Sequence, residues 1–361
     1  MEKPTVLGYI RSQPEVLRET LQRQEEFVAV LRSLFSEHPI KKVLFFGSGT
    51  SYNAANIAAY YFKQIVGLEA VAWYPTVYEN YEIADWTGNL TKEEILFIGI
   101  SQSGTSVSTV QVIKKARKEG YLTLALTGNL QSEISKYAEH LALLTVGDEL
   151  TPPETKGFTV TVLSLYLWAL ALAHLKDVIT AEYYHQQLGN LAAVLAKFEA
   201  VITESEAWYQ ANKEEILNSQ CLYVLGYGID YGSALEGQLK IGEMLRLPTI
   251  GFELEEYVHG PTMALNPRHT IFLIGSQERE WERMLLFRQT FKKYTQQVYL
   301  LTVNDVEHDK RDLIFSIKAD KFVAPLLYAV PLQIVAAQGA LDRGIDTGIN
   351  PFDEALAHYP E

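Results

Sequence analysis

The chain has 361 residues, 48% of them hydrophobic, and its 44 acidic against 31 basic residues give a formal net charge of −13. This length supports two or three globular units with substantial cores. The charge disfavours binding to nucleic acid or to an anionic membrane, and no basic patch is segregated from the rest of the sequence.

The N-terminus shows no apolar signal core, because Met1 is followed by Glu2, Lys3 and Pro4. We therefore expect a cytoplasmic protein. Residues 7–36 are predicted to form a helical lead-in to the first strand.

Two hydroxyl-rich glycine loops follow strand-like apolar runs. The run 43–46 enters Gly47–Ser51, and the run 96–99 leads to Ser101–Ser106. Such loops bind phosphate through backbone N–H groups and hydroxyls at helix N-termini, without needing a cation. We therefore expect a phosphorylated small molecule as the ligand.

A dinucleotide is the alternative ligand for the first loop. Gly47-x-Gly49 follows a strand, and Glu69 lies about 20 residues further on, as a ribose-binding acid should. However, Tyr52 replaces the third glycine of that motif, and the loop hydroxyls suit a terminal phosphate better than a pyrophosphate. A Walker-type loop is absent, since no Gly-Lys-Ser/Thr follows the glycines.

Two helices are predicted next in the chain. Apolar residues recur at three-to-four spacing over 105–120, with Gly120 as a C-terminal cap. The apolar run 160–175 is shorter than the roughly 20 residues of a membrane span, and we expect a helix buried between domains or subunits.

The second half of the chain repeats the first. The run 222–225 enters Gly226-x-Gly228-x-x-Tyr231, which repeats the Gly47 motif at an offset of 179 residues. Two further strand signals match, 96–99 with 271–275 and 121–124 with 299–302. Three matches in the same order predict two copies of one α/β unit.

Apolar runs alternate with helical patterns in both copies, which is typical of an α/β fold, here two duplicated doubly wound parallel-sheet units. We assign residues 1–200 to the first domain, 201–345 to the second and 346–361 to a C-terminal tail. Ligands bind beyond the carboxyl ends of such strands. The second copy reads Ser276-Gln277-Glu278-Arg279 where the first has serines, so we expect the first to hold the phosphate and the second to supply chemistry.

The candidate chemistry lies in the second copy. Glu236, Lys240 and Glu243 are spaced by four and three, which places them on one face of a helix, although a solvated salt-bridge ladder would have the same spacing. His259 precedes Gly260-Pro261, so a rigid turn can deliver its imidazole to a pocket. A carboxylate and an imidazole provide a base and an acid for moving protons on a sugar.

No cofactor or metal is expected, because the eight histidines show no paired ligand spacing with cysteine or carboxylates. Cys221 opens a strand-like run and is interpreted as a small apolar residue rather than a nucleophile.

Together these motifs resemble the sugar isomerase (SIS) domain family, and specifically the tandem isomerase half of glutamine:fructose-6-phosphate amidotransferase. The resemblance covers nearly the whole chain and implies two flavodoxin-like units. The motifs occur in the family's order: Gly-Thr-Ser-Tyr, Ser-Gln-Ser-Gly, Thr155-Lys156, Ala-Leu-Glu-Gly-x-Leu-Lys-x-x-Glu and His-Gly-Pro.

The resemblance implies roles for individual residues. Glu243 is the base that moves a proton between the first two sugar carbons, Glu236 and Lys240 shape the site, and His259 opens the ring from a second subunit, which requires a dimer. The residues implied to bind the substrate phosphate are Ser51, Ser101, Gln102, Ser103 and Ser106, with Gly49, Thr50 and Thr155 contacting the substrate.

Three departures from the family pattern stand out. We expect no glutaminase domain with its N-terminal cysteine. The tail reads Leu356-Ala357-His358 where the family has Leu-Ala-Lys, whose lysine forms a Schiff base; we expect His358 to cover or tune the site. Glu154 replaces a serine, where a carboxylate can meet a substrate ammonium or serve a structural, solvent-facing role.

These departures are typical of the stand-alone relatives, the fructosamine-6-phosphate deglycases, whose substrate already carries an amine at C1. We therefore expect release of an aldose 6-phosphate and a free amine. The alternatives are an aldose–ketose or amino-sugar-phosphate isomerase or deaminase, and a sugar-phosphate sensor without catalysis. Sensors of this fold usually add a basic helix-turn-helix domain, which this sequence lacks.

Overall fold

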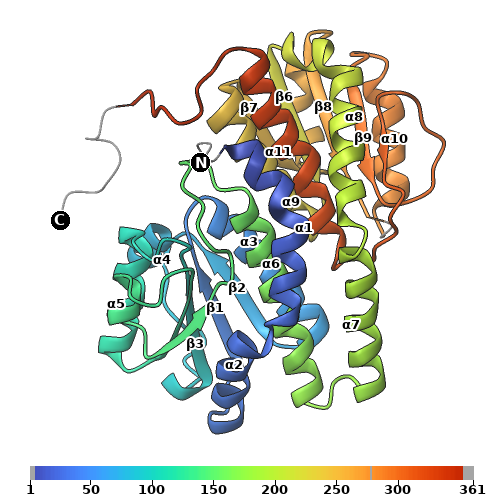
Figure 1. The fold of residues 1–361 in the computed structure, drawn as a ribbon. Coiled ribbons are helices and arrows are strands. Elements are labelled where there is room, and N and C mark those ends of the chain that lie inside the picture. The colour runs from blue at the N-terminus through green and yellow to red at the C-terminus, as the bar shows by residue number, and fades with distance from the viewer. Residues whose placement is uncertain (1–4, 277–278, 353–361) are drawn as a thin grey trace. The chain divides into compact units, whose positions relative to one another are not determined.

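The computed structural model describes residues 5–276 and 279–352 (Figure 1). The chain forms two compact units, each built around one sheet. The first-sheet unit contains Glu15–Glu149 and Gly157–Asn190, and the second-sheet unit contains the residues before Glu15 together with Leu150–Lys156 and Leu191–Ile349. The start of the helical lead-in thus groups with the second sheet.

The first-sheet unit has five parallel strands in the order β2-β1-β3-β4-β5. The strands are β1 (Lys42–Phe46), β2 (Glu69–Trp73), β3 (Ile95–Ile100), β4 (Leu122–Thr127) and β5 (His140–Leu143). The helices and short turns, some of which extend into the other unit, are α1 (Val6–Gln22), α2 (Glu25–Glu37), α3 (Thr50–Tyr61), the π-turn η1 (Phe62–Val66), α4 (Pro75–Tyr81), η2 (Lys92–Glu94), α5 (Val107–Glu119), η3 (Ile134–Lys136), α6 (Lys156–Leu175) and α7 (Ala181–Leu195).

The second-sheet unit also has five parallel strands, in the order β10-β9-β8-β6-β7. The strands are β6 (Cys221–Gly226), β7 (Thr249–Glu253), β8 (His269–Ile274), β9 (Val298–Thr302) and β10 (Leu313–Ile314). The helices and short turns are α8 (Phe198–Leu217), α9 (Asp230–Lys240), the π-turn η4 (Ile241–Leu245), η5 (Glu256–Val258), η6 (Pro261–Ala264), α10 (Trp281–Phe291) and α11 (Ala324–Asp342).

The two sheets share one topology, which confirms the predicted duplication and α/β class. Read from the opposite edge, the second order becomes β7-β6-β8-β9-β10, the counterpart of β2-β1-β3-β4-β5. Each helix that follows the glycine turn ends in a π-turn, at Phe62–Val66 and at Ile241–Leu245. These turns lie at the same offset as the glycine motifs, so even this irregular feature is repeated.

Apolar runs form the central strands because both faces of each sheet are covered. Strands β3, β4 and β8 are buried along their whole length, as expected for parallel strands between helices. Helices α6 and α11 are long and apolar enough to cross a membrane, yet 89% of each apolar window is buried inside the structure. The apolar run 160–175 is thus part of a core helix.

Candidate functional site

The two glycine loops of the first-sheet unit meet at the carboxyl edge of the sheet. Strands β1 and β3 pair directly, with Phe46 opposite Gly99. The chain adds β2 on one side of β1 and β3 to β5 on the other side, so the direction in which strands are added reverses between β1 and β3. In doubly wound folds this switch point is where ligands bind. Gly47–Ser51 and Ser101–Ser106 therefore follow neighbouring strands at the ligand edge.

Glycine is required in the first loop. A Cβ on Gly47 would lie 2.8 Å from the backbone carbon of Ser51, and Gly49 has φ 56°, a conformation that L side chains rarely adopt. Helix α3 begins at Thr50 without a side-chain cap. The N-terminus of a helix carries partial positive charge, which favours an anion bound at this loop.

In the second loop, a serine hydroxyl forms a hydrogen bond with the loop backbone. Ser101 Oγ accepts a hydrogen bond from the Gly104 N–H at 3.1 Å and keeps its own O–H to donate. Gly104 has φ 70°, and a Cβ there would lie 1.9 Å from Ser132 Oγ. Ser106 begins α5 without a side-chain cap hydrogen bond. A second uncapped helix N-terminus thus lies among serine hydroxyls.

A pocket of about 680 Å³ is lined by Ser48, Ser103 and Ser106 together with residues of α4. The α4 residues, Thr76, Glu79 and Asn80, were missed by the sequence analysis. The available signal was Pro75, which begins a helix directly after β2. Burial raises the pKa of Glu79 above its usual value.

Gln102 binds the carboxylate of Glu149 and does not line this pocket. Its Nε2 donates to Glu149 Oε2 at 3.2 Å, and the same carboxylate oxygen accepts from the Gly157 N–H at 3.1 Å. Ser51, Ser101 and Gln102 are absent from the lining of the 680 Å³ pocket. Their binding of one phosphate, together with Ser103 and Ser106, remains a prediction, as does substrate contact by Gly49 and Thr50.

Glu236, Lys240 and Glu243 come together in the second-sheet unit, where Lys240 lies close to both carboxylates. Lys240 Nζ lies 2.8 Å from Glu243 Oε2 and 3.8 Å from Glu236 Oε1. The side chains of Lys240 and Glu236 are 2% and 1% exposed, whereas that of Glu243 is 36% exposed. A solvated ladder is therefore excluded, and one carboxylate of a buried ionic cluster opens to solvent.

The ionic state of this cluster follows from its charges. Burial alone would lower the pKa of Lys240, but Glu236, Glu243 and Glu154 raise it above its usual value. Lys240 is thus a cation at neutral pH. Glu243 lies in the π-turn, an irregular element that is frequent at functional sites.

The segment that carries Glu154 is held by a buried amide chain. Gln333 Nε2 donates to the carbonyl of Thr155 at 2.9 Å, and Gln333 Oε1 accepts from Gln13 Nε2 at 2.8 Å. Both glutamines are fully buried. Sequence analysis missed this chain because the two glutamines lie 320 residues apart.

His259 lies on an exposed turn, followed by Gly260 with φ 140°. Within the described residues, no hydrogen bond or ion pair joins its ring to Glu243. Arg283 lowers the pKa of the Glu255 carboxyl through a hydrogen bond, and the charge of His259 contributes to the same shift. Its ring-opening role remains a prediction.

In the second copy, an aspartate stands at the position that corresponds to a serine of the first glycine loop. Asp230 lies at the offset of Ser51, and its carboxylate accepts from the N–H of Ser276 at 2.9 Å and from its hydroxyl at 3.3 Å. Asp230 is buried. A carboxyl group of the chain itself at this position supports the prediction that phosphate binds to the first copy. Gln277 and Glu278 lie outside the described residues, as does His358.

The other candidate ligands are limited. Glu69 is the first residue of β2 and pairs with Lys42 at 2.8 Å, at the end of the sheet opposite to the ligand edge, which argues against the dinucleotide alternative. Burial raises the pKa of the Cys221 thiol, which disfavours the nucleophilic thiolate. Among the described residues, no group of three or more His, Cys, Asp or Glu side chains could hold a metal ion.

Comparison with known families agrees with the duplicated architecture. The SIS domain profile matches residues 38–174 and again 215–341. The chain belongs to the SIS domain family. These two matched segments contain both sheets and all the strands that carry the loops described above.

Relatives of this tandem SIS-domain chain are similar along most of its length. Glutamine--fructose-6-phosphate aminotransferase [isomerizing] of Gloeobacter violaceus is 26% identical over 352 residues, covering 94% of this chain and 56% of the relative. The chain thus spans about half the length of the curated relatives that it matches.

Two solved structures have the same fold. A Clostridium difficile 630 protein assigned as a phosphosugar isomerase superposes with a TM-score of 0.84 at 28% identity, covering 98% of this chain and 97% of that one. The C-terminal domain of glucosamine-fructose-6-phosphate aminotransferase from Francisella tularensis superposes with a TM-score of 0.82 at 22% identity, covering 96% and 98%.

Proposed function

We propose that this SIS-domain protein is a phosphosugar isomerase-type enzyme acting on a 6-phosphorylated ketosamine, which it cleaves to an aldose 6-phosphate and a free amine in the cytoplasm. The observation that supports this most is the buried Lys240 cation beside the partly exposed Glu243 carboxylate. The uncapped N-terminus of α5 among serine hydroxyls supports binding of a phosphate monoester.

In the proposed reaction Glu243 removes a proton from C1 of the open-chain ketosamine, and the C2 oxygen takes up a proton. Reprotonation at C2 and loss of the proton on nitrogen give an aldimine, and addition of water at C1 then expels the amine. Because the substrate supplies its own nitrogen, no enzyme lysine has to form an imine. Lys240 holds Glu243 in place, and Glu236 completes the ion cluster.

Two substrates separate the proposed function from its alternatives. Purified protein is incubated with fructoselysine 6-phosphate and, separately, with glucosamine 6-phosphate. Release of lysine supports the deglycase, whereas release of ammonia or formation of a ketose phosphate from the second substrate identifies a deaminase or isomerase. Binding of sugar phosphate without turnover over hours would identify a sensor.

Glu243→Gln tests the role of the carboxylate. General acid–base groups contribute roughly 10²–10⁴ in rate, so we expect kcat to fall by that factor. Hexose 6-phosphate binding, measured by calorimetry, should be retained. Glu282→Gln on the exposed surface of α10 is the matched control. If Glu243→Gln retains most of its activity, the assignment of the base is wrong.

A further inference from the structure

The π-turn that carries Glu243 ends in an unusual backbone conformation. Its C-cap residue, Arg246, has φ 55° and ψ 38°, in the left-handed region that residues with a side chain rarely adopt. Among residues 5–276 and 279–352, Asp177 is the only other non-glycine residue with a positive φ. Such a conformation costs stability and is retained mostly where function needs it. We therefore looked for what the Arg246 side chain contributes.

The first copy of the unit has a glycine at this position. Its π-turn is followed by Gly67, which has φ 75°. Gly67 and Arg246 are separated by the same 179 residues as the glycine motifs. Glycine adopts this conformation without steric cost. The second copy thus has a strained arginine where the first copy forms the same backbone turn with an unstrained residue.

The Arg246 side chain binds the turn that follows α11. Its Nη2 donates to the carbonyl of Asp346 at 3.2 Å and to the carbonyl of Ile349 at 2.7 Å. One Nη2 carries two N–H groups, so both bonds can form at once, and the charge of the guanidinium strengthens each of them. Arg246 therefore links the end of the π-turn to a segment 100 residues further along the chain.

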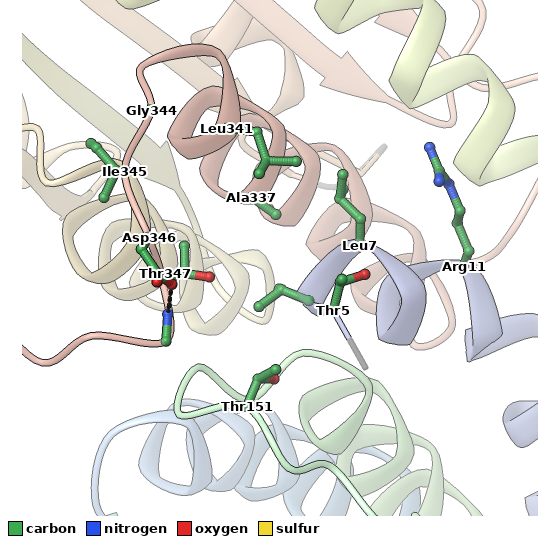
Figure 2. Close-up of a pocket in the computed structure, with 12 residues that line it drawn as sticks. Thr5, Leu7, Arg11, Thr151, Ala337, Leu341, Gly344, Ile345, Asp346 and Thr347 are labelled. Atoms are coloured by element: carbon green, nitrogen blue, oxygen red, sulfur yellow. Dashed lines mark hydrogen bonds between the residues drawn. The ribbon is translucent and has the colours of Figure 1, made fainter. Parts of the chain in front are cut away.

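This anchoring turn is itself held by internal hydrogen bonds. Gly344, with φ 67°, follows the end of α11, and its N–H donates to the carbonyl of Leu341 at 2.9 Å. The Gly348 N–H donates to Asp346 Oδ1 at 2.8 Å, and the turn forms one side of a pocket of about 490 Å³ (Figure 2). The carbonyls that accept from Arg246 thus belong to a braced segment.

Helix α11 also holds the buried side of the same π-turn. A Cβ on Gly339 would lie 3.1 Å from Leu245 Cδ1, so the helix packs closely against the turn. The buried residues of the turn are Ile241, Met244 and Leu245. The Glu243 side chain, by contrast, is 36% exposed. Apolar packing holds one face of the turn, and the Arg246 bonds hold its end.

We propose that Arg246 is a positioning residue for the Glu243 carboxylate. It lies three residues beyond Glu243 and ties the end of the π-turn to the turn after α11, so that the carboxylate keeps one position beside Lys240. A displacement of about 1 Å can lower the rate of a reaction about 100-fold. This inference rests on the proposed function and adds the residue that places its base.

Three substitutions separate the side-chain bonds from the backbone strain. Arg246→Met removes the donors and keeps the strain, Arg246→Gly removes both, and Arg246→Lys keeps a charged donor. We expect kcat for fructoselysine 6-phosphate to fall about 10- to 100-fold in Arg246→Met and Arg246→Gly, and less in Arg246→Lys. The KM should change little, because the phosphate is proposed to bind to the loops of the first-sheet unit.

Urea denaturation distinguishes positioning from a purely structural role. Arg246→Gly loses two hydrogen bonds but relieves the strain, so its urea midpoint should stay close to that of wild type while kcat falls. A purely structural role predicts instead that kcat follows the midpoint, with Arg246→Gly more active than Arg246→Met. Asp177→Gly places glycine at the other left-handed position and is the matched control, with kcat unchanged.

Hydrogen exchange measures the anchoring without any substrate. Mass spectrometry should show faster exchange over residues 241–250 in Arg246→Met than in wild type, and equal exchange over residues 62–71 of the first copy. Unchanged exchange over 241–250, or wild-type kcat in Arg246→Met, would overturn the proposal. If the wild type cleaves no ketosamine 6-phosphate, the proposed function itself fails, whereas the exchange rates still decide whether Arg246 anchors the π-turn.

Discussion

At the scale of single residues, Lys240 is the centre of the buried ion cluster in the second-sheet unit. It is buried between two carboxylates, and removing one partner of a buried ion pair leaves an uncompensated charge. We expect Lys240→Met to lower the free energy of unfolding by about 3–5 kcal/mol, measured by urea denaturation. The double variant Lys240→Met/Glu236→Leu should recover much of this loss.

The control for this prediction is Lys213→Met, because Lys213 forms a more exposed ion pair with Asp342 at 3.5 Å. Exposed pairs contribute at most about 1 kcal/mol. Equal effects of the two lysine substitutions would show that the cluster around Lys240 contributes no special stability.

Asp85 gives a prediction about pH at the same scale. The backbone N–H of Leu90 foremost, with Thr87 and Asn89, lowers the pKa of this carboxyl to about 2 from 3.8. The folded state therefore favours the ionised form, and this stabilisation is present above about pH 4 and lost as the pH falls through 2. Asp85→Asn should lower the urea midpoint at pH 6 but not at pH 2.

Asp305→Asn serves as the comparison, since the Asp305 side chain is 88% exposed. A difference between wild type and Asp85→Asn that persisted unchanged down to pH 2 would contradict the assigned cause.

At the scale of elements, α11 positions the loop that carries Glu154 through one buried amide. Gln333→Leu removes the buried hydrogen bonds to Thr155 and Gln13, which we expect to cost about 1–3 kcal/mol of unfolding free energy. We also expect kcat/KM to fall, because the loop loses its anchor. Gln338→Leu, on the same helix and bonded only to Asp342 among the described contacts, should change neither quantity.

An activity loss in Gln333→Leu without any loss of stability would argue against this anchoring role. The double variant Gln13→Leu/Gln333→Leu provides a second measurement. It replaces both partners of the Gln13–Gln333 hydrogen bond by apolar side chains and should be more stable than the single variant.

Most elements could be predicted from sequence because their signals are local. The glycine turns, the apolar strands and the Gly120 cap each depend on neighbouring residues, and the Glu236–Lys240–Glu243 cluster follows from helical spacing. The Gln13–Gln333 contact, the Asp230–Ser276 contact and the α4 wall depend on tertiary placement. The π-turns were missed because their sequences are compatible with a continuous helix.

At the scale of the whole molecule, we propose a homodimer in which His259 serves the Glu243 of a second copy. The exposed position of His259 supports this arrangement. Mixing inactive Glu243→Gln and His259→Ala chains, followed by dissociation and reassociation, should restore roughly a quarter of wild-type activity, because half of the dimers are mixed and each has one intact site.

The matched mixture is Glu243→Gln with the double variant Glu243→Gln/His259→Ala, in which no site is intact and no activity should return. Failure of the first mixture to regain activity, in a sample shown to be dimeric, would contradict the shared site.

The π-turn at Phe62–Val66 and its counterpart at Ile241–Leu245 also bear on the history of the chain. An irregularity at the same place in both halves is what duplication of one unit that already contained it would produce. The residue that corresponds to Glu243 in the first of these turns is Gln64, which cannot ionise. The two halves therefore differ in charge at this position, with an amide in one and a carboxylate in the other, on a backbone feature that both keep.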